Sequence, residues 1–130
     1  MGKELWMIYD KAGLARNSTF VELFAERGRP YDIAVEAVLD TEYLSLLEKG
    51  SRPQAVLVRT ICPSINAELE KRQIPVWNSS FVSRICNHKG KTREYLKDTV
   101  FCTPAVTCNS SKINEILSCT CLLYTSDAAD

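Results

Sequence analysis

The run Leu5-Trp6-Met7-Ile8-Tyr9 is the stretch that decides the fold of this chain. Its residues are apolar, and no polar residue alternates with them. A strand of this kind is buried on both faces, which is typical of a parallel sheet that helices cover on each side. The run therefore predicts an α/β fold, provided that the rest of the chain supplies further strands and helices.

The following residues alternate between helix and strand patterns. Further strands are expected at Tyr31–Leu39, Ala55–Val58 and Ile74–Trp77. Helices are expected to start at Asn17 or Ser18, at Asp40 or Thr41, and at Ser64, where polar residues can cap them. Gly28 and Gly50 follow the first two helices as stop signals, and Asp10–Gly13 is interpreted as a loop. This order predicts an α/β fold with an open, Rossmann-like parallel sheet and helices on both faces.

Ligands of such sheets bind beyond the carboxyl ends of the strands. Arg59 and Asn78 follow two of the expected strands, so both are candidate substrate contacts, with a loop-structuring role as the alternative. Asp10 follows the first strand, but it lacks the acidic partner that a receiver-type phosphoacceptor would need. A dinucleotide-binding oxidoreductase would need a glycine-rich turn at this place, and Gly13 is the only glycine there.

Two more helices are expected beyond the fourth strand. One is capped by Asn78, Ser79 or Ser80 and buries Phe81, Val82 and Ile85; the next is capped by Asn87 and buries Tyr95 and Leu96. An extended segment at Val100–Val106 and a short helix at Ser110–Leu117 complete the expected elements.

The second of these helix starts carries positive charge at the end where a helix is itself positive. With Asn87 as N-cap, His88, Lys89 and Lys91 all fall in or near the first turn. Cations there are disfavoured by about 0.3–1 kcal/mol each, whereas a bound phosphate would reverse the sign. The alternative is that the lysines are solvated surface residues, and neither of the best-known glycine-rich phosphate loops occurs in the chain.

Composition narrows the possible classes of protein. The 130 residues include 16 basic and 16 acidic side chains, so no overall charge attracts nucleic acid or an anionic membrane. No apolar run reaches membrane-spanning length, and the first residues lack a signal-peptide pattern, so a cytoplasmic protein is expected. Six cysteines without a CxxC pair, beside a single histidine, predict reduced cysteines and no metal site.

The stretch from Val76 to Lys89, Val-Trp-Asn-Ser-Ser-Phe-Val-Ser-Arg-Ile-Cys-Asn-His-Lys, resembles the end of the first domain of ATP-grasp ligases. It is most similar to the RimK-like branch, in which a strand ending in Asn-Ser leads into a helix and a lysine motif opens the next helix. The segment from Leu5 to Phe24 resembles the opening of the same branch. His88 departs from the pattern, because the family often has Asp at this position.

The resemblance implies a pre-ATP-grasp domain followed by a central and a C-terminal domain, with ATP bound between the last two. It implies that Lys89 contacts the ATP phosphates, with Lys91 as a weaker candidate. The family phosphorylates a carboxylate, and an amine of a small molecule or peptide attacks the acyl phosphate. Magnesium bridges the phosphates in such chemistry, but its ligands belong to the family's C-terminal domain. No catalytic residue and no bound cofactor are therefore expected in this chain.

The expected domains are 1–100, the α/β pre-ATP-grasp domain, and 101–120, the start of a truncated central domain. The last ten residues, 121–130, match a translated frame of a common transposon-end sequencing adapter, so an artefact is expected there. The function expected is that of an ATP-dependent carboxylate–amine ligase fragment, inactive alone. The alternative is a stand-alone α/β binding module without catalysis.

Overall fold

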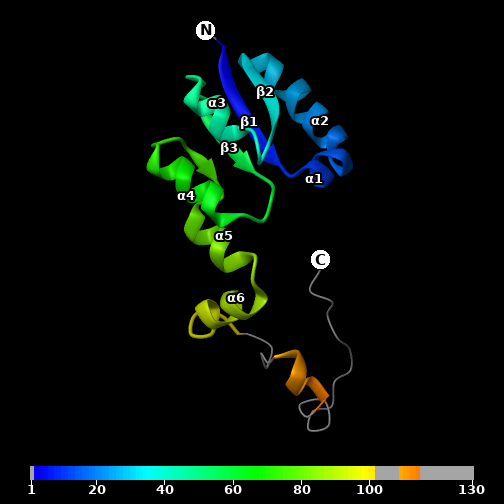
Figure 1. Ribbon diagram of the computed structural model, residues 1–130, viewed down its shortest axis with the longest axis vertical. Helices are drawn as coiled ribbons and strands as arrows, with labels where there is room; N and C mark the ends of the chain where they lie inside the picture. The colour runs from blue at the N-terminus through cyan, green and yellow to red at the C-terminus, as the bar shows by residue number, and fades with distance from the viewer. Residues whose placement is uncertain (1, 102–108, 115–130) are drawn as a thin grey trace. The chain divides into compact units, whose positions relative to one another are not determined.

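The computed structural model describes residues 2–101 and 109–114 (Figure 1). The chain divides into two compact units, of which the first ends at Asn87 and the second begins at His88. The expected boundary near residue 100 thus lies within the second unit. The expected artefact at 121–130 lies outside the described residues.

The first unit is built on a four-stranded parallel sheet with the strand order β2-β1-β3-β4, which confirms the α/β fold expected from the sequence. The strands are β1 (Lys3–Tyr9), β2 (Ile33–Leu39), β3 (Ala55–Val58) and β4 (Val76–Trp77). Ile8 pairs with Val38 on one side and with Val58 on the other, so β1 is an interior strand. Trp6, Met7, Ile8 and Tyr9 are all buried, as the unbroken apolar run predicted.

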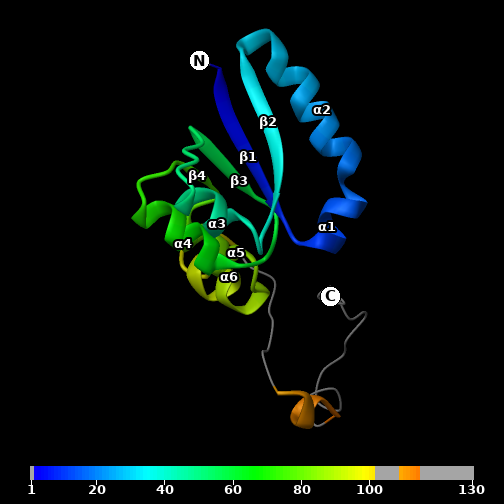
Figure 2. The same ribbon diagram turned by 45° about the horizontal axis from the view of Figure 1, so that its top comes forward.

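Helices cover both faces of this sheet (Figure 2). They are α1 (Lys11–Arg16), α2 (Ser18–Gly28), α3 (Tyr43–Glu48) and α4 (Pro63–Lys71), with a short 3-10 helix η1 (Arg29–Tyr31) before β2. The last helix of this unit, α5 (Ser80–Cys86), packs against α4. Gly28 of α2 lies against β2: a Cβ added there would be 2.8 Å from the Ile33 carbonyl oxygen and 3.4 Å from Val35. A larger residue at Gly28 would therefore push α2 away from the sheet.

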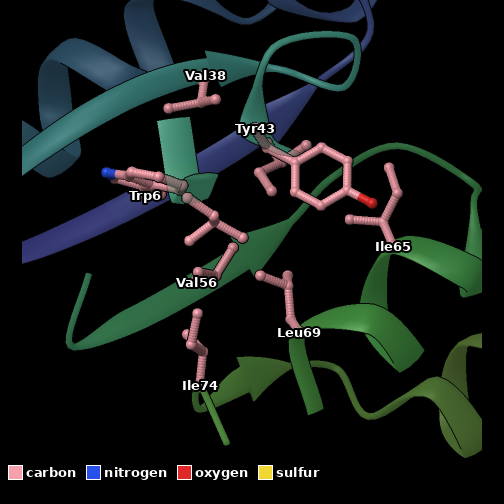
Figure 3. Packing of buried hydrophobic residues seen from close by; sticks show 9 residues of the cluster. Trp6, Val38, Tyr43, Val56, Ile65, Leu69 and Ile74 are labelled. Carbon is pink, nitrogen blue, oxygen red and sulfur yellow. The ribbon is translucent and has the colours of Figure 1, made fainter. Parts of the chain in front are cut away.

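The opposite face carries the main hydrophobic core (Figure 3). Its buried members come from three strands, from α3 and α4, and from the segment before β4: Trp6, Ile8, Val38, Tyr43, Leu47, Val56, Ile65, Leu69 and Ile74. Apolar residues four apart, as in the Tyr43–Leu47 and Ile65–Leu69 pairs, place their side chains on one side of each helix. The inward orientation expected for Ile65 and Leu69 is confirmed.

Several expected boundaries were wrong for local reasons. Lys11–Arg16 is a helix and not a loop, because the Asp10 carboxylate accepts a hydrogen bond from the Gly13 amide and caps it. The strand expected from Tyr31 begins at Ile33, because Asp32 has a left-handed φ of 56° that ends η1. Gly50 follows α3 with a φ of 101°, which confirms its role as a stop.

Two helix starts also differ from the expected ones. α3 begins after Glu42 and not after Asp40 or Thr41. α4 begins after Cys62 and not at Ser64, because Pro63 occupies its first turn, where the missing N–H costs no helical hydrogen bond. α2 starts at Ser18 as expected, although its N-cap Asn17 makes no side-chain capping bond.

The second unit contains helix α6 (Lys89–Leu96) and the 3-10 helix η2 (Ser110–Lys112). η2 falls in the segment where a helix was expected, and Val100 and Phe101 are exposed. The remainder of the expected Val100–Val106 segment, and the part of Ser110–Leu117 after residue 114, lie outside the described residues. Within the described ranges, no helix has the length and apolar character needed to cross a bilayer.

The burial expected for the last two helices was largely wrong. Phe81 and Val82 of α5 are exposed to 54% and 37%, and Tyr95 of α6 is exposed to 58%. The residue of α5 that is buried is Ser83. Apolar periodicity identified these helices but not the side that faces the protein, because α5 packs against α4 instead of the sheet.

Candidate functional site

The strand order creates a switch point at the carboxyl edge of the first unit. From β1, the chain crosses to β2 on one side, and the connection from β2 returns to β3 on the other side. The segments that follow the neighbouring strands β1 and β3 therefore run in opposite directions along the sheet. Open α/β sheets bind ligands in the crevice between two such segments. The Arg59 amide donates to the Ile8 carbonyl oxygen at 2.8 Å and holds the two strand ends together.

Asp10 lies at this switch point and has a structural task. One carboxylate oxygen accepts the Gly13 amide at 2.6 Å, and the other lies 3.5 Å from the Thr60 hydroxyl. Gly13 is buried, and a Cβ there would be 3.2 Å from the Asp10 carboxylate. Both oxygens of Asp10 thus have neighbours that fix them, which suits a helix cap better than a phosphoacceptor.

Arg59 follows β3 and places its positively charged guanidinium at the same edge of the sheet. Its guanidinium carbon lies 5.3 Å from the centre of the Phe20 ring, within the range of a cation–π contact. Phe20 itself packs on Phe24 of α2, with ring centres 4.8 Å apart. This stacking orients the side chain of Arg59, which is exposed at the surface.

Asn78 follows β4, next to β3, so the strand ends that carry Arg59 and Asn78 are neighbours. The peptide bond between Trp77 and Asn78 is cis. The backbone carbonyl oxygen of Asn78 accepts a hydrogen bond from the side-chain Nδ2 of Asn66 at 2.6 Å. Sequence reasoning therefore identified the turn but not the residue that holds it.

Asn66 is the most deeply buried polar residue of the described chain, with 1% of its surface exposed. Its Oδ1 atom has no hydrogen-bond partner among the described residues. A signal existed in the sequence: Asn66 follows Ile65 and precedes Leu69 by three positions, so helical spacing turns it toward the core. An amide in such a place needs a partner, and a neighbouring turn was the available one.

A second side chain of α4 holds the same turn. The Glu70 carboxylate accepts hydrogen bonds from the Ser80 amide at 2.7 Å and from the Ser80 hydroxyl at 2.5 Å. These two bonds lower the pKa of Glu70 below its ordinary value. Ser79 caps α5 through its hydroxyl, which accepts the Val82 amide at 3.2 Å. Ser79 was one of three expected caps, whereas Glu70 was missed because it acts from another helix.

In the second unit, helix α6 begins one residue later than expected. Asn87 is not its N-cap but the C-cap of α5, and the Asn87 side chain donates to the Ser83 hydroxyl at 3.1 Å. His88 is the N-cap, because its Nδ1 atom accepts the Lys91 amide at 3.3 Å. Imidazole is an unusual cap, which explains why the preceding Asn looked better in the sequence.

The corrected start places Lys89 first and Lys91 third in α6. Both side chains are exposed, and the first turn contains no acidic residue. The two predicted phosphate contacts thus fall in the same turn, but two positions apart, so their side chains leave the helix on different sides. Within the described ranges, no group of three His, Cys, Asp or Glu side chains is arranged to hold a metal ion.

Comparison with known proteins gave no match to any protein-family model, curated protein or solved structure.

Proposed function

We propose that this chain is the N-terminal α/β domain of an ATP-dependent carboxylate–amine ligase of the RimK-like ATP-grasp type. In this proposal Lys89 contacts the phosphates of ATP, and Lys91 gives a weaker second contact. The observation that carries the proposal is the first turn of α6, which contains both lysines and no acidic residue at the positive end of the helix.

This charge arrangement is unfavourable in the absence of a ligand. The N-terminus of a helix has about half a unit of positive charge, so each cation there costs about 0.3–1 kcal/mol, and less when solvent screens it. A phosphate group removes this cost, because the positive end of the helix and the ammonium groups then attract the same anion. The helix start is therefore better suited to an anion-bound state than to an empty one.

The chemistry of the proposed ligase needs charge neutralisation more than it needs a base. Transfer of a phosphoryl group from ATP to a carboxylate gives an acyl phosphate and ADP, and attack by an amine then forms the C–N bond and releases phosphate. A lysine that neutralises phosphate oxygens lowers the barrier to the first step. Magnesium would assist the same step, but the described residues contain no metal-binding group, so its ligands would come from other parts of the enzyme.

Arg59 and Asn78 are proposed as weaker contacts of the substrate. They follow the neighbouring strands β3 and β4 at the carboxyl edge of the sheet. The stacked guanidinium of Arg59 suits a carboxylate, and the side-chain amide of Asn78 suits a polar group of either substrate. Both assignments belong to the first unit and are independent of the lysines of α6.

The proposal can be tested by NMR titration of the ¹⁵N-labelled 130-residue chain with ATP and with inorganic triphosphate. We expect the amide signals of Lys89 and Lys91 to shift with both ligands, at an affinity in the millimolar range (Kd roughly 1 mM) because one side of the site is present. Lys89→Ala should abolish the shifts, and Lys112→Ala, also in the second unit, should preserve them.

Unchanged shifts in Lys89→Ala would remove this lysine from the site. Micromolar affinity of the wild-type chain for ATP would contradict the proposal that this chain supplies only one side of the ATP site. In an enzyme that contains this domain, Lys89→Ala is expected to weaken ATP binding and slow acyl-phosphate formation, which a hydroxylamine trap would measure.

A stand-alone binding module remains the second candidate, and one observation favours it. The first unit has its own buried core, which joins the sheet to α3 and α4 without any residue of the second unit. Such a domain could act through its surface alone. The coding sequence around this segment distinguishes the two functions, because the ligase requires a central and a C-terminal ATP-grasp domain downstream.

A further inference from the structure

His88 is the only histidine among the 130 residues, and it occupies the N-cap of α6. Its Nδ1 atom accepts a hydrogen bond from the Lys91 amide at 3.3 Å, and its φ of −137° and ψ of 104° give it the extended backbone of a cap residue. Its carbonyl oxygen accepts the Thr92 amide at 2.9 Å. The side chain and the backbone of one residue thus hold the first turn of α6.

The acceptor of this cap can be lost to a proton. A neutral imidazole has one nitrogen that carries a proton and donates, and one that is bare and accepts. For Nδ1 to accept the Lys91 amide, the proton must be on Nε2. Once protonated, the ring has two donors and no acceptor, so it can no longer cap that amide. A hydroxyl cap, such as that of Ser79 on α5, is not lost in this way.

We propose that His88 is a pH-sensitive switch for the first turn of α6, which is capped when the imidazole is neutral and open when it is protonated. Two effects act in the same direction. Protonation removes the acceptor of the Lys91 amide, and it adds a third cation to a helix start that already contains Lys89 and Lys91. The capped turn is therefore favoured above the pH range in which the imidazole titrates, and it is lost as the pH falls through that range.

The charged groups around His88 allow its proton to be singled out. Histidine ordinarily changes charge between about pH 5 and 8, whereas lysines such as the two in the first turn ordinarily stay protonated there. The acidic residues Glu94 and Asp98 lie toward the other end of α6. A hydrogen bond from Lys97 at 2.5 Å and the charge of Lys97 hold the pKa of Glu94 below its ordinary value of 4.5. The other described element of this unit, η2, contributes the cation Lys112.

The switch regulates the proposed phosphate contact. Lys89 and Lys91 are the first and third residues of α6, so they lose the positions that the helix gives them when its first turn opens. Proton uptake at His88 thus removes the ordered form of the site. This consequence rests on the proposed function, whereas the cap hydrogen bond and its loss in acid do not.

A single histidine gives a single imidazole signal, so its titration can be followed in the intact 130-residue chain. The test is an NMR titration of the ring and of the Cα carbons between about pH 5 and 8. The Cα shifts of residues 89–92 should move from helical toward random-coil values as the ring takes up its proton, with the same midpoint. The ratio of capped to open turn should fall by roughly 3- to 10-fold. The Cα shifts of Phe81 and Val82 in α5, whose cap is the Ser79 hydroxyl, are the internal reference and should show no such step.

Two variants separate the cap from general effects of acid. His88→Asn supplies an amide oxygen that can accept the Lys91 amide whatever the pH, so α6 should keep its helical Cα shifts through the whole titration. His88→Ala has no acceptor, so the first turn should be open throughout and should show no step. A cap that titrates predicts both the rescue by Asn and the loss in Ala.

The proposal is overturned if the Cα shifts of α6 stay constant while the imidazole of His88 titrates. It is equally overturned if His88→Asn retains the wild-type step. Titration with inorganic triphosphate at about pH 8, where histidine is ordinarily neutral, tests the proposed function separately. Unshifted Lys89 and Lys91 amides in that titration, together with an intact His88 step, would remove the phosphate contact and keep the switch.

Discussion

The helices α5 and α6 follow each other in the chain, but their N-termini have opposite electrostatics. At α5, the carboxylate of Glu70 accepts two hydrogen bonds from Ser80 and neutralises the positive end of the helix. At α6, the cap is His88, and Lys89 and Lys91 occupy the first turn without an acidic residue. The start of α5 thus receives a carboxylate from another helix, whereas the first turn of α6 contains two lysines and no acidic residue.

This difference separates a structural helix start from a candidate binding site. A helix whose N-terminus already accepts a carboxylate has little to gain from another anion. A helix that adds cations to its positive end gains from an anion twice, through its amides and through its lysines. The comparison therefore assigns α5 to the framework of the first unit and α6 to the proposed phosphate contact.

The largest effect on stability is expected in the core under α4, because α5 packs against this helix. Leu69 has no exposed surface, and its replacement by Ala should leave a cavity and lower the free energy of unfolding of the first unit by about 2–5 kcal/mol. Leu23→Ala, at a residue of α2 that is 45% exposed, is the control and should cost within about 0.5 kcal/mol. Urea denaturation measures both. Equal losses in the two variants would mean that Leu69 is not a core residue of the first unit.

A smaller effect is expected from the cap of α5. Ser79→Ala removes the hydroxyl that accepts the Val82 amide and should lower stability by about 0.5–2 kcal/mol. Ser64→Ala is a matched control, because Ser64 was expected to cap α4 but lies after its cap, Cys62. Thermal unfolding compares the two. A larger loss for Ser64→Ala would show that α4 starts where the sequence suggested.

A charge reversal in α6 tests the unfavourable lysines directly. Without an anion, Lys91→Glu should stabilise α6 by up to about 0.3–1 kcal/mol, because it places a negative charge at the positive end of the helix. Lys71→Glu should do the opposite at α4, where Lys71 lies in the last turn and a cation is favourable. Amide hydrogen exchange in each helix measures the changes. Slower amide hydrogen exchange in wild-type α6 than in the Lys91→Glu variant would contradict the view that the lysines are unfavourable at this helix start.

The smallest effect is expected from Glu70→Gln, because the amide oxygen of Gln can still accept the Ser80 backbone N–H and its NH2 group can donate to the Ser80 hydroxyl. The wild-type pKa of Glu70 is lowered by these bonds, so its stabilising contribution is present above pH 4.5 and is lost as the pH falls through the lowered value. Glu70→Gln should lack this loss in acid, measured as the change in Tm from neutral to acid pH. An identical acid dependence in both chains would mean that the Glu70–Ser80 contact does not stabilise α5.

Hydrophobic pattern alone was sufficient for the framework of the first unit. The apolar run at Leu5–Tyr9 and the short strand at Ala55–Val58 were recognisable because a strand buried on both faces has no alternative environment. Ile65 and Leu69 were recognisable because helical spacing places them on one side of α4. The parallel sheet and its order of elements followed from these local signals.

The interactions between elements could be known from the tertiary structure alone. The bonds of Asn66 and Glu70 to the turn before α5 join residues 12 and 10 positions apart, and no local pattern specifies such pairs. The exposure of Phe81 follows from the packing of α5 on α4, and the alignment of Trp6 with Glu36 follows from the register of β1 with β2. Side-chain periodicity is a property of one segment, whereas burial and hydrogen-bond partners depend on which segments meet.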